Sequence, residues 1–275
     1  MSIVIGGIAP HPPLIIPDIG RGELQAVEQT VNAMKNFAKQ MAAAAPETFV
    51  IITPHGAMFR DALSFVAEDE LYGDFLKFGA PQVKLRAKND TELLEAIIKC
   101  AEDENIEIVK LSGKGSGTFG DESALDHGTT VPLFYLQEAG TGGNLISITY
   151  GLLPAEDLFS FGKALSRAVE KLGRRTAVIA SGDLSHRLTR DAPAGYHPRG
   201  KEFDEKLTEY VSEYQVEEIL KMDEDLVASA GECGLRSIIV LLGSLSDKGF
   251  KPEVLSYEGP FGVGYLVSLF KQEEG

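Results

Sequence analysis

Short runs rich in β-branched residues alternate along this chain with longer amphipathic stretches, and this alternation constrains the fold more than any other feature. Short apolar runs of this kind are typical of buried strands, and apolar residues at helical spacing are typical of helices that cover a core. A repeated change from strand to helix favours an α/β protein with a largely parallel sheet. We therefore predict a single domain over residues 1–275, folded as a three-layer α/β sandwich with a mixed, mostly parallel central sheet.

The boundaries of the expected elements follow from the same patterns. Strands are predicted at Ile3–Ile8, Phe49–Thr53, Val83–Arg86, Glu107–Leu111, Leu145–Thr149, Thr176–Ala180, Glu253–Tyr257 and Val263–Phe270. Helices are predicted at Arg21–Ala44, Asp90–Glu104, Ala155–Leu172, Gly200–Ser212, Val216–Met222 and Gly234–Asp247. Only a few residues separate the last two strands, so we expect these strands to pair antiparallel.

Charge and cysteine content exclude several classes of function. The chain has 26 basic and 41 acidic residues, a formal net charge of −15. A surface this acidic repels phosphate groups, so we expect neither nucleic acid nor a membrane as a partner. Two cysteines are too few for a disulfide framework, and we see no leader sequence or membrane-spanning run. We therefore expect a reduced, cytoplasmic protein. We also expect a homo-oligomer.

The placement of the five histidines indicates a site. His11, His55 and His186 each come just after a predicted strand, and His127 lies in a glycine-bounded loop. The carboxyl ends of parallel strands meet at one edge of a sheet, where ligands bind, so these side chains should converge. His197 has no strand before it, and we interpret it as a structural residue.

Glu232 is placed differently from most acidic residues of the chain. It lies among small residues just before an apolar helix, where the helix N-terminus favours a carboxylate. It either caps that helix or binds a metal. Two imidazoles and one carboxylate form the facial triad of non-haem Fe(II) sites, with Zn²⁺ as the main competitor. Cys233 is either a small buried residue or a soft ligand for copper or oxidised iron.

A glycine-rich segment offers a weaker signal. Residues 115–120 match Gly-x-Gly-x-x-Gly after a predicted strand. Acidic residues and His127 follow this match where a dinucleotide site has an apolar helix, so the sequence disfavours such a site.

Five motifs, taken together and in order, resemble those of a known family. They are Pro-His-Pro-Pro at His11, Thr-Pro-His-Gly at His55, Leu-Asp-His-Gly at His127, Gly-Asp-Leu-Ser-His at His186 and Gly-Glu-Cys-Gly at Glu232. Over essentially its whole length the chain resembles class III extradiol ring-cleaving dioxygenases of the catalytic B-subunit type. It looks closest to the branch associated with AMMECR-type domains and Memo-like proteins.

This resemblance implies a function and a role for each residue. His11, His55 and Glu232 would bind Fe(2+), His186 would be the catalytic acid and base, and His127 would be a second active-site histidine. The implied activity is the opening of a catechol-like aromatic ring with O₂. The alternative is a Memo-like metal-binding protein that acts with a separate AMMECR-type or radical SAM partner in a modification pathway. A zinc hydrolase on the same scaffold is a third interpretation.

Overall fold

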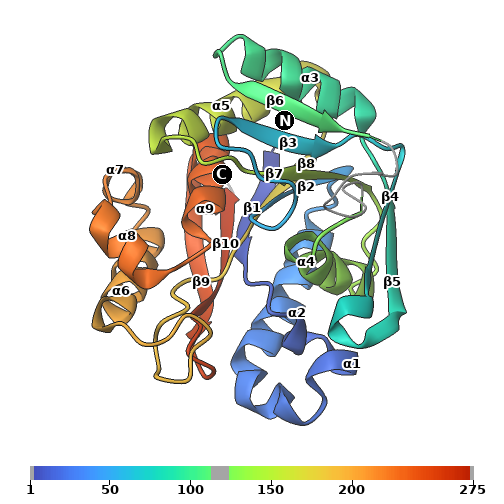
Figure 1. The fold of residues 1–275 in the computed structure, drawn as a ribbon. Coiled ribbons are helices and arrows are strands. Elements are labelled where there is room, and N and C mark those ends of the chain that lie inside the picture. The colour runs from blue at the N-terminus through green and yellow to red at the C-terminus, as the bar shows by residue number, and fades with distance from the viewer. Residues whose placement is uncertain (1–2, 113–123, 273–275) are drawn as a thin grey trace.

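The structure is a computed structural model and describes residues 3–112 and 124–272 (Figure 1). Its strands are β1 (Ile3–Ala9), β2 (Thr48–Thr53), β3 (Ala62–Val66), β4 (Glu70–Phe75), β5 (Ala80–Lys88), β6 (Glu107–Leu111), β7 (Asn144–Thr149), β8 (Thr176–Ser181), β9 (Phe250–Glu258) and β10 (Tyr265–Gln272). Its α-helices are α1 (Pro17–Gly20), α2 (Glu28–Ala43), α3 (Thr91–Glu102), α4 (His127–Glu138), α5 (Ala155–Leu172), α6 (Pro198–Ser212), α7 (Val216–Leu220), α8 (Glu224–Ala230) and α9 (Leu235–Leu245). Short 3₁₀ helices are η1 (Pro13–Ile15), η2 (Arg21–Val27) and η3 (Leu76–Phe78).

Eight of these strands form one mixed sheet in the order β6-β3-β7-β2-β8-β1-β10-β9. The four central strands β7, β2, β8 and β1 run parallel, with Ile51 of β2 beside both Ser147 and Ile179. Strand β3 is antiparallel to β7, and β10 is antiparallel to both β1 and β9. The predicted mixed, mostly parallel sheet and its antiparallel last pair are therefore confirmed.

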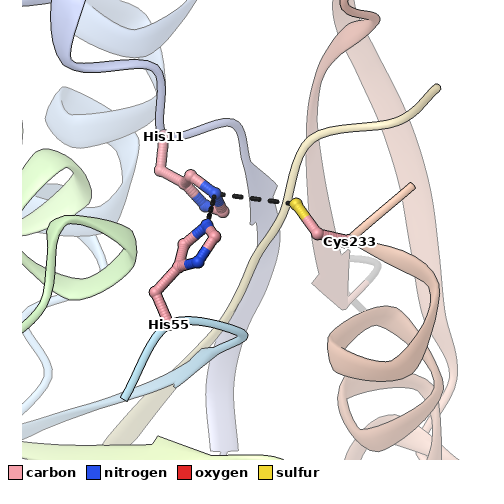
Figure 2. A group of neighbouring side chains, drawn as sticks. All are labelled: His11, His55 and Cys233. Carbon is pink, nitrogen blue, oxygen red and sulfur yellow. Dashed lines mark hydrogen bonds between the residues drawn. The ribbon is translucent and has the colours of Figure 1, made fainter. Parts of the chain in front are cut away.

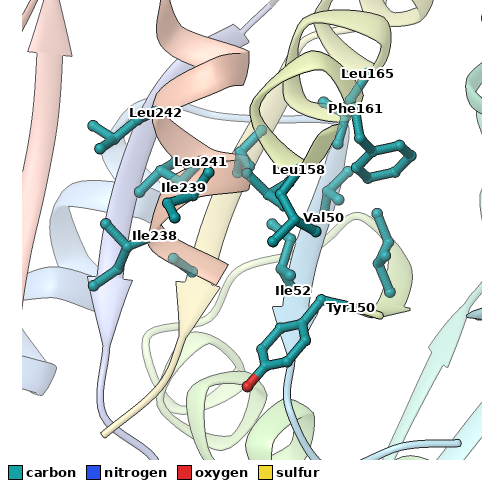
Figure 3. Packing of buried hydrophobic residues seen from close by; sticks show 14 of the residues in the cluster. Val50, Ile52, Tyr150, Leu158, Phe161, Leu165, Ile238, Ile239, Leu241 and Leu242 are labelled. Carbon is teal, nitrogen blue, oxygen red and sulfur yellow. The ribbon is translucent and has the colours of Figure 1, made fainter. Parts of the chain in front are cut away.

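Helices cover both faces of this sheet, as the predicted three-layer sandwich requires (Figure 1). Alternate residues of β2 point to opposite faces because successive side chains of a strand do so. Val50 and Ile52 pack in the core beneath α3, α5 and α9, as Figure 3 shows for α5 and α9. Phe49 and Ile51 pack in a second core beneath α2 and α4. All four are buried, and this burial of both faces stabilises the central strands.

Several predicted boundaries were wrong for identifiable reasons. The predicted strand Val83–Arg86 lies within β5, which pairs only with β4 in a separate hairpin. The predicted helix Arg21–Ala44 is a true α-helix only from Glu28, after the 3₁₀ segment η2. Helix α4 was not predicted, because eight of its twelve residues are buried and it contains Pro132, so it lacks an amphipathic period. The prediction also missed β3, β4 and the short helix α8.

No helix in the described ranges is long and apolar enough to cross a membrane. The glycine-rich match at residues 115–120 lies outside the described residues.

Candidate metal centre

Three histidines lie just beyond the carboxyl ends of adjacent parallel strands. His11 follows β1, His55 follows β2 and His186 follows β8, and these strands are neighbours in the order β2-β8-β1. The structure brings these side chains together, and the ring centroids of His11 and His55 lie 4.8 Å apart. This is the edge at which open α/β sheets bind ligands.

A chain of hydrogen bonds fixes the ring of His11. The hydroxyl of Ser181 donates its proton to the carbonyl oxygen of Gly128 at 2.5 Å. The same hydroxyl lies 2.8 Å from Nδ1 of His11. Because a hydroxyl has only one proton, it must accept from Nδ1–H of His11. His11 is therefore the Nδ1–H tautomer, which turns the lone pair of Nε2 toward the cluster as a metal ligand requires.

Figure 2 shows three potential ligands that converge on one point. Nε2 of His11 lies 3.0 Å from Nε2 of His55 and 3.7 Å from Sγ of Cys233. The ligand atoms of all three lie within 4.8 Å of one another. Nitrogens about 2.0–2.1 Å and sulfurs about 2.3 Å from one ion lie roughly 3–4 Å from each other. The donor set and its spacing therefore fit a single transition-metal ion.

Two glycines allow Cys233 to reach the end of the sheet. A Cβ atom on Gly182 would lie 2.2 Å from Cα of Gly234, closer than side chains can approach. Since neither residue has a side chain, the turn before α9 packs directly on the loop after β8. Two hydrogen bonds hold this contact. N–H of Cys233 donates to the carbonyl oxygen of Asp183 at 3.2 Å, and N–H of Asp183 donates to Sγ of Cys233 at 3.3 Å.

Glu232 is not part of this cluster. Its carboxylate accepts a hydrogen bond from N–H of Leu235 at 2.6 Å, at the start of α9, and it lines a cavity that no histidine lines. Its capping role is therefore the one that the contacts describe, while its role as a metal ligand stays a prediction. The next residue, Cys233, has its Sγ 3.7 Å from Nε2 of His11 and offers the third ligand atom.

His127 is the first residue of α4 and packs on His55. The two rings stack, with centroids 4.1 Å apart and an interplanar angle of 22°. Asp126 caps the helix by accepting from N–H of Thr129, and it also accepts from the hydroxyl of Thr53 at 2.6 Å. This network ties the start of α4 to the end of β2 and so holds the His127 ring over the site.

His186 also lies beside Cys233. Its Nε2 lies 3.8 Å from Sγ of Cys233. Its backbone N–H donates to the carbonyl oxygen of Ala230 at 3.2 Å, and Ser185 Oγ donates to the same oxygen at 3.0 Å. The loop that carries His186 is thus anchored to the end of α8.

The imidazoles of the site are all held toward their neutral forms. Burial, followed by the charges of the neighbouring histidines, lowers the pKa of His11 well below its ordinary value. Burial likewise lowers the pKa of His55 and His186, and it brings the pKa of His127 to about 3. Burial raises the pKa of the Cys233 thiol well above its ordinary value, and a bound metal would displace that proton. Neutral imidazoles are the form that binds metals.

Phe78 and Asp183 belong to the site but were not singled out from the sequence. The Phe78 ring lies 5.3 Å from that of His127, edge to face, and it comes from the tip of the β4–β5 hairpin. Asp183 accepts a hydrogen bond from N–H of His11 at 2.9 Å, and its burial raises its pKa to about 7. Only one strand of this hairpin was predicted, as Val83–Arg86, and nothing in the pattern placed its tip at the site, whereas Asp183 stands in the same post-strand motif as His186. His197 caps α6, accepting from N–H of Arg199 at 3.3 Å.

The protein is thus a three-layer α/β sandwich. Its candidate metal centre, formed by His11, His55 and Cys233, lies at the carboxyl ends of the central strands. Residues 7–268 match the family model described as the catalytic LigB subunit of aromatic ring-opening dioxygenase. The chain therefore belongs to the LigB family, in agreement with the resemblance of its motifs.

The chain is also similar in sequence to two named proteins. It is 43% identical over 260 residues to protein CA_C1420 of Clostridium acetobutylicum, a match that covers 94% of this chain and 56% of that protein. It is 28% identical over 204 residues to the MEMO1 family protein PYRAB05390 of Pyrococcus abyssi, covering 68% of this chain and 62% of that one. The chain thus spans a little over half the length of these relatives.

The crystal structure of the uncharacterized protein JW3007 from Escherichia coli K12 shares the fold. Its TM-score is 0.62 at 12% identity, with 98% of this chain and 99% of that chain covered.

Proposed function

We propose that this chain binds Fe(2+) through His11, His55 and Cys233 and opens a catechol-like aromatic ring with O₂. The observation that carries the proposal is the convergence of two imidazole nitrogens and one thiol within 4.8 Å, at the binding edge of a LigB-family fold. The reaction places both atoms of O₂ in the ring-opened product, so it needs no external reductant. Cys233 replaces the Glu232 of the sequence prediction as the proposed third ligand.

Bound iron would supply the O₂ chemistry and hold the two hydroxyl oxygens of the substrate. The chain's own residues would then position the substrate and move protons. His186, neutral because burial lowers its pKa, accepts a hydroxyl proton at Nε2 and returns it to the product. His127, stacked on His55, orients the substrate by a hydrogen bond. Phe78, edge-on to His127, offers an aromatic contact for the substrate ring.

A second candidate is favoured by the thiol. A thiolate is a softer ligand than a carboxylate and suits copper or zinc as well as iron. A Memo-like role, in which the metal-loaded chain acts with a separate AMMECR-type or radical SAM protein, uses the same His11, His55 and Cys233 site. The match to a protein of the MEMO1 family supports this alternative.

Oxygen uptake separates the two candidates. The protein is loaded with Fe(2+) without air, mixed with a panel of catechols, and given O₂ while oxygen consumption and the yellow ring-opened product are followed. Ring opening predicts that one O₂ is consumed for each catechol opened, and that both signals disappear in Cys233→Ala. Metal bound at the site with no oxygen consumed on any catechol would contradict the dioxygenase proposal and favour the Memo-like role.

A further inference from the structure

A second cavity, of about 620 Å³, lies apart from the metal cluster. Its walls come from the segment before α5, from the α7–α8 region and from the first turns of α9, and they include Leu158, Ile219, Leu235 and Ile239. All four of these side chains are buried, and Figure 3 shows Leu158 of α5 beside Ile239 of α9. Its volume is within the range of pockets that hold small molecules. None of the histidines lines it, so it is distinct from the proposed metal site.

Arg236 is the cationic group of this cavity. It lies in the first turn of α9, half-buried, and its charge acts on Glu232 and Tyr150. Within residues 3–112 and 124–272 it makes no hydrogen bond, and no carboxylate oxygen lies within 4.0 Å of it. The chain has 41 acidic residues against 26 basic ones, so acidic partners are plentiful. A half-buried guanidinium without one is poised for an anion from outside the chain.

Among the described residues, neither of the two acidic residues that line the cavity forms an ion pair with Arg236. The carboxylate of Glu232 is turned toward the α9 backbone, where it accepts from N–H of Leu235 at 2.6 Å. Glu224 is exposed, at the start of α8. The group that can recognise a ligand is therefore the guanidinium, set among apolar side chains.

We propose that this cavity binds a small molecule that has a carboxylate and an apolar body. The carboxylate pairs with Arg236, whose planar guanidinium suits a two-oxygen anion. The apolar body lies against Leu158, Ile219 and Ile239 and gains from leaving water. This proposal does not rest on the proposed ring-opening activity.

The location of the cavity links it to the metal cluster through one short turn. Glu232 faces the cavity and Cys233 faces His11, and Tyr150 Oη donates to the carbonyl oxygen of Cys233 at 2.9 Å. A ligand at Arg236 therefore sits against the segment that positions the thiol.

The test uses metal-free and metal-loaded protein with 1-anilinonaphthalene-8-sulfonate as a fluorescent probe, displaced by octanoate or by 1-octanol. We expect octanoate to displace the probe at concentrations at least about tenfold lower than octanol, the factor that corresponds to one ion pair of about 1.4 kcal/mol. In Arg236→Gln, this advantage of octanoate should disappear while displacement by octanol stays unchanged. Arg167→Gln, which removes a surface arginine paired with Glu104, is the matched control and should behave as the unaltered protein.

Ala228→Trp locates the site without touching the arginine. Ala228 is exposed on the cavity wall, so a large side chain there should fill the cavity and abolish displaceable probe binding. The proposal is overturned if octanoate and octanol compete equally in the unaltered protein, if Arg236→Gln keeps the octanoate advantage, or if Ala228→Trp binds the probe normally.

Discussion

The polar groups at the two ends of strand β2 have opposite kinds of neighbour. At the amino end, the buried carboxylate of Asp90 accepts from the hydroxyl of Thr48 at 2.5 Å, from N–H of Leu93 at 3.1 Å and from Arg174 at 2.7 Å. At the carboxyl end, His55 faces His11 across 3.0 Å. The amino end pairs a carboxylate with an arginine, whereas the carboxyl end brings imidazole rings together.

This difference separates stability from function. Asp90, 3% exposed, finds three donors and also caps α3, so its burial is compensated. The histidines of the carboxyl end lose solvation without gaining an opposite charge of comparable strength, and their pKa values fall. Buried groups with shifted pKa values of this kind are typical of binding sites, which agrees with the metal site that we propose.

The largest expected effect comes from a substitution at the carboxyl end, which should change catalysis alone. Replacing His186 by Ala should lower kcat for ring opening by about 10²–10⁴-fold, because it removes the proposed proton acceptor. Iron content should stay unchanged, since His186 is not among the proposed ligands. Steady-state kinetics with metal analysis measures both, and a variant with an ordinary rate would refute the assigned role.

A substitution at the amino end should lower stability and leave the metal site unchanged. Asp90→Ala removes a helix cap and leaves Thr48 and Arg174 without this partner, although Arg174 keeps Glu92. We expect a loss of about 2–3 kcal/mol in the free energy of unfolding, from the cap and the lost hydrogen bonds. Urea unfolding measures it, and metal affinity at the far end of β2 should not change. Glu95→Ala, which removes an exposed ion pair with Lys110, is the control and should cost far less.

A third prediction concerns the pH dependence of stability. The pKa of His127 is about 3 in the folded protein against an ordinary 6.5, so between these values the unfolded chain binds more protons. The free energy of unfolding contributed by His127 therefore rises with pH from about 3 to 6.5, by up to about 1.4 kcal/mol per pH unit. His127→Gln should flatten the profile of the metal-free protein in this window.

Two buried acids give that profile an opposing slope. The pKa values of Asp183 and Asp204 are raised to about 7, so their contributions to stability are lost as the pH rises from about 4 through 7. Both acids remain in the His127→Gln variant, and the difference between the two proteins isolates the histidine. An unchanged slope in the variant would show that His127 titrates normally.

The sequence predicted the strands that carry the histidines of the site, while Glu232 as the third ligand stays a prediction beside the Cys233 that the structure places in the cluster. Strands such as Phe49–Thr53 end in turns marked by proline and glycine, so the convergence of His11, His55 and His186 followed from sheet geometry. Helix α4 has eight of its twelve residues buried and lacks a helical apolar stripe, so it was missed. Its first residue, His127, was identified from the motif alone.

The choice between Glu232 and Cys233 depended on a backbone detail. Glu232 lines the cavity and Cys233 faces His11, and the turn that carries them has Gly231 in a left-handed conformation, with φ 62°, and Gly234 packed on Gly182. Periodicity and residue type carry no information on this orientation.

Cobalt binding tests the central claim, a metal centre completed by Cys233, most directly. Metal-free protein is titrated with Co(2+) without air while the near-ultraviolet thiolate-to-cobalt charge-transfer band is recorded. We predict this band in the unaltered protein and in Glu232→Gln, and its loss in Cys233→Ser with an affinity reduced by more than about 100-fold. A charge-transfer band that is absent from the unaltered protein, together with an affinity that falls in Glu232→Gln but not in Cys233→Ser, would contradict the account.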